Sequence, residues 1–259
     1  MDRLYFQSAA RSVVGLIRNG NEDSALIGSQ VIAVADGMGG HVGGEIASSV
    51  AINTLADISP LFTNSEIDAD SASDLFLNSL HTIDAQIHAV FQDEPQLSGM
   101  GTTLTALFIN GLEVSLLHIG DSRAYRLRGN ELLQISADHT VLQELLNNGV
   151  ISESDAADHP QRSMLTQALM GNKNLEPVLQ VFDGKAKDRF LLCSDGLSGV
   201  LTEKEIKILI KGKDATAAID SLIDATYING APDNVTVVIA DLVDISTSEV
   251  TKLGAAQNQ

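Results

Sequence analysis

The sequence of 259 residues has no tryptophan, five prolines and a single cysteine, Cys193. A lone cysteine excludes a disulfide within one chain and favours a reducing compartment. No apolar run approaches the roughly 20 residues that a membrane span needs, and no secretory signal is evident. We therefore expect a cytoplasmic protein with no membrane span in this sequence. A tether to the membrane would require a segment beyond Gln259.

Basic residues are scarce relative to acidic ones. The chain has 16 Lys and Arg against 34 Asp and Glu, which gives a net charge of −18. Such a surface repels a polyphosphate backbone, so nucleic acid is excluded as a partner. An anionic substrate would need locally bound cations to reverse the sign of the field.

The pattern of apolar residues predicts a mixed fold with a sizeable core, since 44% of the residues are hydrophobic. Helices are predicted over Gly43–Ile58, Ser73–Phe91, Glu203–Lys211 with Thr202 as N-cap, and Ala215–Tyr227. Strands are predicted over Ser12–Ile17, Gln30–Ala35, Thr102–Asn110, Glu113–Ile119, Arg123–Arg128, Glu131–Ile135, Val178–Phe182, Arg189–Cys193 and Val235–Asp241. The turns Asn110-Gly111 and Gly129-Asn130 predict consecutive hairpins. This pattern indicates an α+β fold with antiparallel sheets and helices on the sheet faces.

Three segments differ from the rest of the chain. Residues 1–9 contain Leu4–Ser8, which resembles a protease-cleavable expression tag, so we expect them to lie outside the fold. Residues 138–171 alternate turn residues with short helical stretches, Val141–Asn147 and Glu153–Ala157, which is typical of an inserted lobe. Residues 244–259 are polar and aperiodic, which predicts a tail or the start of a linker. The remaining residues 10–243 form the expected folded domain.

Four aspartates occupy similar places in this pattern. Asp36, Asp121 and Asp195 each follow an apolar strand, and Asp233 precedes one. A carboxylate at the end of a buried strand has a rigid support and faces solvent, as a functional site requires. Each aspartate alone is better explained as a turn residue. The four together favour a shared acidic cluster, which must protonate or bind cations such as Mg²⁺, Mn²⁺ or Ca²⁺.

Other catalytic arrangements fail on spacing. A cysteine phosphatase loop needs Arg six residues after its Cys, but the residue six positions after Cys193 is Gly199. No Gly-x-Ser-x-Gly elbow and no Gly-x4-Gly-Lys phosphate loop is present. No pair of His or Cys has the spacing of a zinc site. Hard oxygen ligands are therefore the remaining basis for a metal centre.

The aspartates lie within motifs that resemble those of the type 2C metal-dependent protein phosphatases, the PPM family. The matching segments are Arg18–Asp23 (RNGNED), Asp36–His41 (DGMGGH), Gly99–Thr103 (GMGTT), Gly120–Arg123 (GDSR), Ser194–Gly196 (SDG) and Gly230–Thr236 (GAPDNVT). They follow the family's order and span Arg11 to Leu242. The segment His159–Ser163 (HPQRS) looks like the actinobacterial members that oppose Ser/Thr kinases.

The resemblance implies a function for each matched residue. Asp36 would bridge two Mn²⁺ or Mg²⁺ ions with the Gly37 carbonyl as a further ligand, and Asp195 and Asp233 would complete the pair. Asp121 would hold a third ion together with Asp195. Further residues near the ions are implied to be Arg18 on the substrate phosphate, Glu22 and Asp23 on metal-held waters, Asn234 behind the ligands, and Ser163 near the third ion. His41 would protonate the leaving group or bind a metal water, or else only cap the following helix.

The resemblance also implies an αββα sandwich of two antiparallel sheets with an inserted flap, residues 138–171. The implied activity is hydrolysis of phosphoserine and phosphothreonine by metal-activated water, without a covalent intermediate. The implied partners are phosphorylated proteins, including Ser/Thr kinases and their substrates, met by a monomer. The alternative is a catalytically silent metal-binding module that recognises phosphoproteins. Elsewhere in the chain, His118 is expected to be a packed core residue.

Overall fold

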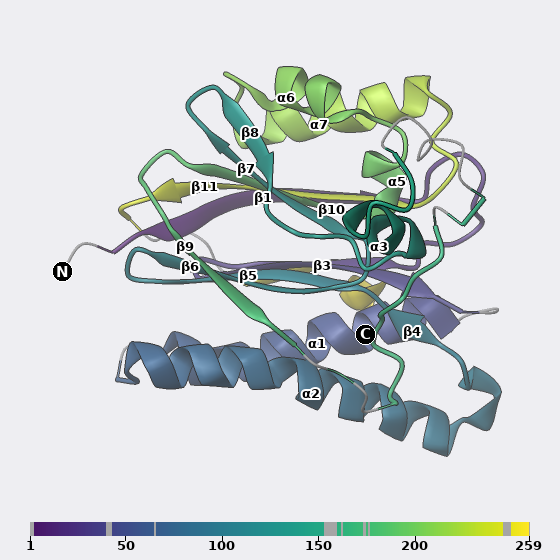
Figure 1. Ribbon diagram of the computed structural model, residues 1–259. Coiled ribbons are helices and arrows are strands. Elements are labelled where there is room, and N and C mark those ends of the chain that lie inside the picture. Colours follow the sequence, from purple (N-terminus) through teal and green to yellow (C-terminus); the bar gives the residue numbers. More distant parts are fainter. Residues whose placement is uncertain are drawn as a thin grey trace.

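Two antiparallel sheets pack face to face, and a pair of helices covers the outer face of each (Figure 1). The computed structural model describes residues 3–39, 43–64, 66–152, 160–161, 163–172, 175, 177–245 and 250–258. The order of layers is helix pair, sheet, sheet, helix pair. The α+β class and the αββα sandwich are therefore confirmed. Among the described residues, no helix is long and apolar enough to cross a bilayer.

The first sheet has the strand order β1-β11-β10-β7-β8. Its strands are β1 (Tyr5–Val13), β11 (Val235–Val243), β10 (Arg189–Cys193), β7 (Arg123–Arg128) and β8 (Glu131–Gln134). Helices α6 (Glu203–Ile210) and α7 (Ala215–Ile228) cover its outer face (Figure 1). The predicted N-cap of α6 is confirmed, because Thr202 and Glu205 form a capping box.

The second sheet has the order β12-β2-β3-β5-β6-β9, with β4 paired to the end of β3. Its strands are β12 (Thr251–Gly254), β2 (Asp23–Ile27), β3 (Val31–Met38), β5 (Leu104–Asn110), β6 (Glu113–Ile119), β9 (Leu179–Asp183) and β4 (Gly101–Thr102). Helices α1 (Gly43–Thr63) and α2 (Ala69–Asp93) lie on its outer face, and the short 3-10 turns η1 (Pro95–Leu97) and η2 (Ala255–Asn258) follow α2 and β12.

The core forms three layers because successive residues of a strand face opposite sides of the sheet. In β3, Ile32 and Val34 face the other sheet, whereas Val31, Ala33 and Ala35 face α1 and α2. A third cluster lies between the first sheet and helices α6 and α7. Central strands are thus buried on both faces, which explains why the sequence shows continuous apolar runs there.

Both chain ends belong to the fold, and this corrects two predictions. Residues 1–9 are not all outside it, because β1 begins at Tyr5, pairs with β11 along its whole length, and buries Phe6 between the sheets. Residues 244–259 are not simply a polar tail. Strand β12 pairs with β2, and Ala255 and Ala256 behind it are buried. Backbone pairing and a few buried side chains hold each end despite weak periodicity.

The strand predicted over Ser12–Ile17 is also misplaced. Strand β1 ends at Val13, and residues 14–20 form turns and a bend that lead towards β2. Strand β2 itself escaped prediction, since it is short and four of its five residues are buried, which leaves no alternation to detect. The predicted hairpin turns are confirmed, with φ of 64° at Gly111 and 61° at Gly129.

The inserted lobe leaves the first sheet after β8 and returns to the second sheet at β9 (Figure 1). Its first helix, α3 (Val141–Asn147), confirms the predicted helical stretch and is capped by Thr140. The second predicted stretch, Glu153–Ala157, lies outside the described residues. An isolated bridge joins Thr140 to Leu165 within the lobe, and a second one joins Leu169 of the lobe to Thr102 of β4.

Candidate metal centre

The four sequence-predicted aspartates converge on one pocket of about 290 Å³. Asp36 lies near the end of β3, Asp121 follows β6, Asp195 follows β10, and Asp233 precedes β11. In antiparallel sheets the end of one strand and the start of its neighbour lie at the same edge. The four segments therefore deliver their carboxylates to one edge of the sandwich, between the two sheets.

Close approach of the segments depends on two glycines. A Cβ on Gly37 would lie 2.0 Å from the Gly44 carbonyl oxygen, and one on Gly196 would lie 1.9 Å from the Asn234 carbonyl oxygen. Any other residue would force the backbones apart at these points. Gly37 therefore lets β3 approach α1, and Gly196 lets the segment after β10 approach the start of β11. This explains why each glycine directly follows a functional aspartate.

Crowding of buried carboxylates dominates the electrostatics of the pocket. Burial, followed by the charges of neighbouring aspartates, raises the pKa of Asp36 well above its usual value. Burial and then Asp195 raise the pKa of Asp121 to about 7. Burial and then Asp233 raise the pKa of Asp195. Each shift has the same cause, since several anions share a space with little water.

The donor set fits hard divalent cations. Carboxylates and a backbone carbonyl are the ligands that Mg²⁺ and Mn²⁺ prefer, and a cation would remove the repulsion that raises these pKa values. In the part of the chain that the structure describes, no group of three or more Asp, Glu, His or Cys side chains is placed to hold one ion. An ion such as Mg²⁺ usually binds through one or two carboxylates and keeps several waters.

Arg18 reaches the pocket from the turn segment after β1. Its Nη2 donates to Asp233 Oδ2 at 2.7 Å, and its side chain remains 52% exposed. This ion pair holds the long Arg18 side chain at the acidic cluster. The guanidinium has further N–H donors that the pair does not use. The predicted contact of Arg18 with a substrate phosphate remains a prediction.

Asn234 connects this turn segment to the start of β11. Its side-chain amide donates to the carbonyls of Val14 at 2.9 Å and Gly20 at 2.8 Å, and its Oδ1 accepts from the Glu22 N–H at 2.8 Å. The side chain is almost fully buried. Asn234 thereby fixes the backbone that carries Arg18 and Glu22, which gives a physical basis for its predicted supporting role.

Glu22 and Asp23 occupy different positions, although they are adjacent. Glu22 lines the pocket, and burial raises its pKa. Asp23 is 1% exposed and lies behind the pocket, where its Oδ2 accepts from Ser194 Oγ at 2.7 Å. Burial raises the pKa of Asp23 to about 7. Asp23 thus joins β2 to the segment before Asp195, and its predicted contact with metal-held waters remains a prediction.

Thr103 is a pocket residue to which the sequence analysis gave no role. Its Oγ1 accepts from the Asp36 N–H at 2.9 Å and forms a hydrogen bond with Ser122 Oγ at 2.7 Å. Its backbone N–H donates to the Asp36 carbonyl at 2.9 Å. The signal was present in the segment GMGTT, but no sequence pattern showed that this segment lies beside Asp36.

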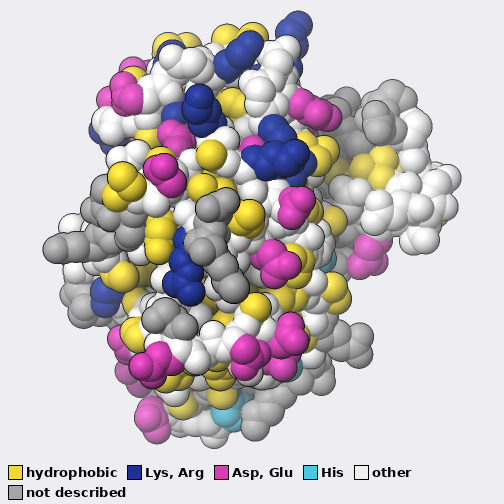
Figure 2. All heavy atoms as spheres, turned by 90° about the vertical axis from the view of Figure 1, so that its left-hand side faces the viewer, with side chains coloured by type: hydrophobic (Ala, Val, Ile, Leu, Met, Phe, Trp, Pro, Cys, Tyr) yellow, Lys and Arg dark blue, Asp and Glu magenta, His cyan; other side chains and the backbone are white. Residues whose placement is uncertain are grey.

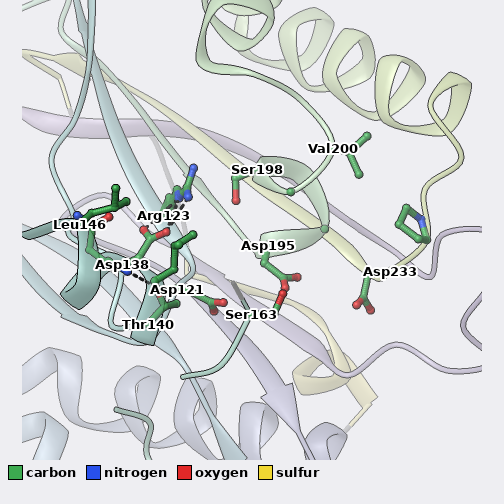
Figure 3. Close-up of a pocket in the computed structure, with 15 residues that line it drawn as sticks. Asp121, Arg123, Asp138, Thr140, Leu146, Ser163, Asp195, Ser198, Val200 and Asp233 are labelled. Carbon is green, nitrogen blue, oxygen red and sulfur yellow. Dashed lines mark hydrogen bonds and ion pairs between the residues drawn. The ribbon is translucent and has the colours of Figure 1, made fainter. Parts of the chain in front are cut away.

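A second and larger pocket of about 580 Å³ adjoins the first and shares Asp121, Ser163, Asp195 and Asp233 with it (Figure 3). Ser163 of the inserted lobe lies beside Asp195 in this view, so the structure brings it to the predicted neighbourhood. One wall of the larger pocket comes from α3, and the facing wall comes from the short helix α5 (Asp195–Ser198), which begins with Asp195. The pocket therefore extends from the carboxylates along the lobe.

Arg123 and Asp138 form the base of the larger pocket. The guanidinium donates to both carboxylate oxygens, with distances between 2.7 and 3.0 Å. This bidentate pair fixes the point where the inserted lobe begins. The sequence places Arg123 in the segment GDSR and Asp138 at the start of the inserted lobe, but it gives no sign of their pairing because they come from separate segments.

The remaining predictions on histidines have separate outcomes. His118 is 9% exposed and packs beside His139, with ring centroids 4.9 Å apart, so its predicted core position is confirmed. Burial lowers the pKa of His118 to about 3, and a neutral imidazole fits this place. His41 lies outside the described residues.

Comparison with known proteins identifies the family. The profile described as protein phosphatase 2C matches residues 21–228, which is most of the chain. The chain belongs to the protein phosphatase 2C family. The predicted family is therefore confirmed. Asp36, Asp121 and Asp195 lie within the matched residues, whereas Arg18 and Asp233 lie outside them.

Two curated members of the protein phosphatase 2C family illustrate the likeness. "Serine/threonine protein phosphatase PstP" of Mycobacterium tuberculosis is 42% identical over 244 residues, covering 93% of this chain and 46% of PstP. The chain thus spans about half the length of this relative. "Serine/threonine phosphatase stp" of Listeria welshimeri is 34% identical over 233 residues, covering 88% of this chain and 92% of that protein. The mycobacterial match agrees with the predicted likeness to actinobacterial members.

A solved protein phosphatase 2C structure shows the same fold with metal present. The crystal structure of the catalytic domain of PstP in complex with two manganese ions is 40% identical, with a TM-score of 0.84. The likeness covers 93% of this chain and 100% of that chain. A relative with this fold therefore binds two manganese ions.

Proposed function

We propose that this chain is a metal-dependent protein serine/threonine phosphatase that uses Mn²⁺ or Mg²⁺. The observation that carries the proposal is the convergence of four carboxylates, from four separate segments, on one pocket. The raised pKa values of Asp36, Asp121 and Asp195 indicate that the anionic cluster requires cations. The family and the two manganese ions of the PstP structure support the same conclusion.

In this proposal two ions would be held by Asp36, the Gly37 carbonyl, Asp195 and Asp233. Asp121 and Asp195 hold a third, weaker one beside Ser163. When bound, such ions supply an activated water and neutralise the phosphoryl oxygens for an in-line displacement. The chain's own contribution is to hold these carboxylates rigidly at the edge of the sandwich, where strand ends and Thr103 fix Asp36.

Arg18 binds the substrate phosphate in this proposal. Its guanidinium is planar and suits two phosphoryl oxygens at once. The contact with Asp233 positions the side chain at the pocket rim, and Asn234 fixes the backbone on either side of it. Glu22 lies on the same rim and orients water near the ions.

A polypeptide substrate is favoured over a small metabolite by the adjoining larger pocket. That pocket continues from the carboxylates towards α3 and α5, and its wall includes the apolar side chains of Leu142, Leu146 and Val200 (Figure 3). A small phosphate ester would fill only the carboxylate end. The residues that flank a phosphoserine or phosphothreonine would lie along this wall.

The natural partners in this proposal are phosphorylated proteins, including Ser/Thr kinases and the substrates of those kinases. We place the domain in the cytoplasm and propose that it acts as a monomer. The alternative is a metal-binding module that recognises phosphoproteins without turnover. The complete set of candidate ligands argues against the alternative. Recognition of a phosphate alone would not require the carboxylates that Asp121 and Asp195 offer to a third ion.

Hydrolysis of an aryl phosphate, with Mn²⁺ and after chelation, tests the proposal. We expect release of the aryl alcohol that depends on the metal. A metal-loaded protein that binds a phosphopeptide but releases no phosphate would establish the silent module instead. As a matched control, Asp188→Asn alters an aspartate that pairs with Arg128 away from the pocket, and it should leave turnover intact.

A further inference from the structure

Positive charge in this acidic protein is concentrated far from the metal centre. Segment 185–213 carries seven of the chain's 16 Lys and Arg but only four acidic residues, a local excess of three positive charges against −18 overall. Figure 2 shows the face opposite the metal pocket, where Lys and Arg side chains gather in the upper half. Asp and Glu side chains lie among them, so the observation is a local excess of positive charge, which can attract an anionic ligand.

The basic residues surround a pocket of about 570 Å³. Its lining includes Lys187, Arg189, Lys211 and Lys213, with Asp241 as the acidic member. It lies at the end of β11 opposite Asp233, and nine strand residues separate the two ends by roughly 30 Å. The basic pocket is therefore distinct from the metal centre.

Arg189 and Asp241 form the frame of the basic pocket. Arg189 donates to both oxygens of Asp241 at 2.7 Å, and its Nη1 donates to the carbonyls of Ile210 at 2.7 Å and Lys213 at 2.8 Å. The two bonds to Ile210 and Lys213 fix the connection between α6 and α7 against the sheet, and the two to Asp241 join neighbouring strands. Because the charge of Asp241 is neutralised by Arg189, the three lysines determine the charge of the opening.

The three lysines have no carboxylate partner within the described part of the chain, although acidic residues outnumber basic ones there. Every ion pair of the described residues joins an Arg to an Asp. Lys211 instead donates to Asn130 Oδ1, and Lys213 donates to Ser221 Oγ, each at 2.6 Å. An ammonium has three donors, so each of these groups keeps capacity for a ligand.

Lys187 has an unusual backbone conformation. Its φ is 73°, a region that disfavours side chains with a Cβ, and its N–H is held by the Leu242 carbonyl at 3.0 Å. A glycine at this position would adopt the positive φ with less strain. A strained lysine at the rim of a basic pocket points to a use for its charge.

We propose that this basic pocket binds the phosphate group of an anionic ligand, through Lys187, Lys211 and Lys213. A phosphate dianion matches three ammonium groups better than a single carboxylate does, because it carries more negative charge and has more acceptor oxygens. The phosphate group belongs either to a small molecule or to a phosphorylated protein segment. Binding at this distance from the metal centre leaves the catalytic pocket open.

Isothermal titration calorimetry on metal-free protein tests the proposal. The protein is freed of metal by chelation and then gel-filtered to remove the chelator, because the uncompensated carboxylates then repel anions from the catalytic pocket. Inorganic phosphate and a phosphoserine peptide are titrated separately at low salt. Saturable binding that weakens with added salt is expected for at least one of them.

Two double variants with the same change in charge distinguish binding in the pocket from a general effect of the protein's net charge. Lys187→Gly with Lys211→Ala removes two lining lysines, and the glycine suits the local backbone, so folding is preserved. Lys204→Ala with Lys207→Ala removes two lysines of α6 that do not line the pocket. The first pair should weaken binding about tenfold, and the second should change it less than about twofold.

Equal weakening by both pairs, or no saturable binding of either probe to the unmodified protein, would overturn the proposal. If only inorganic phosphate binds, the ligand is a small molecule; if the peptide binds more tightly, it is a phosphorylated protein segment. Arg18→Ala should leave the titration unchanged, which places the binding outside the catalytic pocket. Because the assay involves no turnover, its failure is separate from failure of the proposed phosphatase activity.

Discussion

Removal of the Asn234 side chain tests how the turn segment is held over the metal centre. The Asn234→Ala substitution deletes three hydrogen bonds, to Val14, Gly20 and Glu22. At about 0.5–1.5 kcal/mol each, their loss amounts to about 1.5–4.5 kcal/mol. For a chain of this size, each kcal/mol of global stability corresponds to about 2–4 °C in Tm. If part of this free energy is lost only locally, the turn segment loosens without global unfolding, and Arg18 loses its fixed position.

Activity should fall because Arg18 no longer has a fixed position. We expect kcat/KM for an aryl phosphate to fall about 10- to 100-fold in the proposed enzyme, the range for a misplaced binding group. The near-isosteric Asn234→Asp substitution is the matched comparison. It keeps an acceptor for the Glu22 N–H, loses both donors and adds a charge beside Asp233, so it should be at least as harmful.

A double-mutant cycle with Arg18→Ala decides whether Asn234 acts through Arg18. If it does, the double variant should be no slower than Arg18→Ala alone. Fully additive losses in kcat/KM would refute the reasoning and place the effect of Asn234 elsewhere, for example on Asp233. Bound manganese should be measured in every variant, since an unchanged stoichiometry shows that the metal ligands are intact.

Three further predictions concern the carboxylates and the larger pocket. Asp36→Asn should reduce turnover by orders of magnitude yet raise the Tm of the metal-free protein at pH 8, because it removes a buried repelling charge; a lower Tm would contradict this. Asp23 and Asp121 have folded-state pKa values raised to about 7, so the folded protein binds more protons than the unfolded one. The free energy of unfolding of the metal-free protein should therefore fall as the pH rises from about 4 to above 7. Urea titrations at pH 5 and pH 8 measure this, and Mn²⁺ should remove the difference. Val200→Asp should lower kcat/KM for a phosphopeptide while leaving that for an aryl phosphate unchanged; equal losses on both substrates would argue against a polypeptide along this wall.

The layers of the fold were predictable because their cause is local. Apolar spacing located α1, α2, α6 and α7, and the turns at Gly111 and Gly129 identified antiparallel hairpins. The ends of the chain were not predictable by the same means. Strands β1 and β12 are stabilised by pairing with β11 and β2, which are distant in sequence, and their own patterns are weak.

The candidate site divides in the same way. Asp36, Asp121, Asp195 and Asp233 were found from their places at the ends of apolar strands, and the structure brings them to one pocket. Thr103, Arg123 and Asp138 gave no such signal, since their importance comes from contacts between segments that are distant in sequence. The basic pocket was likewise hidden, because its lysines meet only when the start of β10, the end of β11 and the α6–α7 connection lie together.

The sequence by itself determined which residues repel one another strongly enough to require cations, because charge and strand position are written in the chain. Only the tertiary structure decided that Asn234 holds the segment bearing Arg18, that Asp23 lies behind the pocket, and that three lysines line one pocket at the opposite end. The physical reason is that hydrogen bonds and burial depend on distances between segments, and those distances are set by sheet pairing.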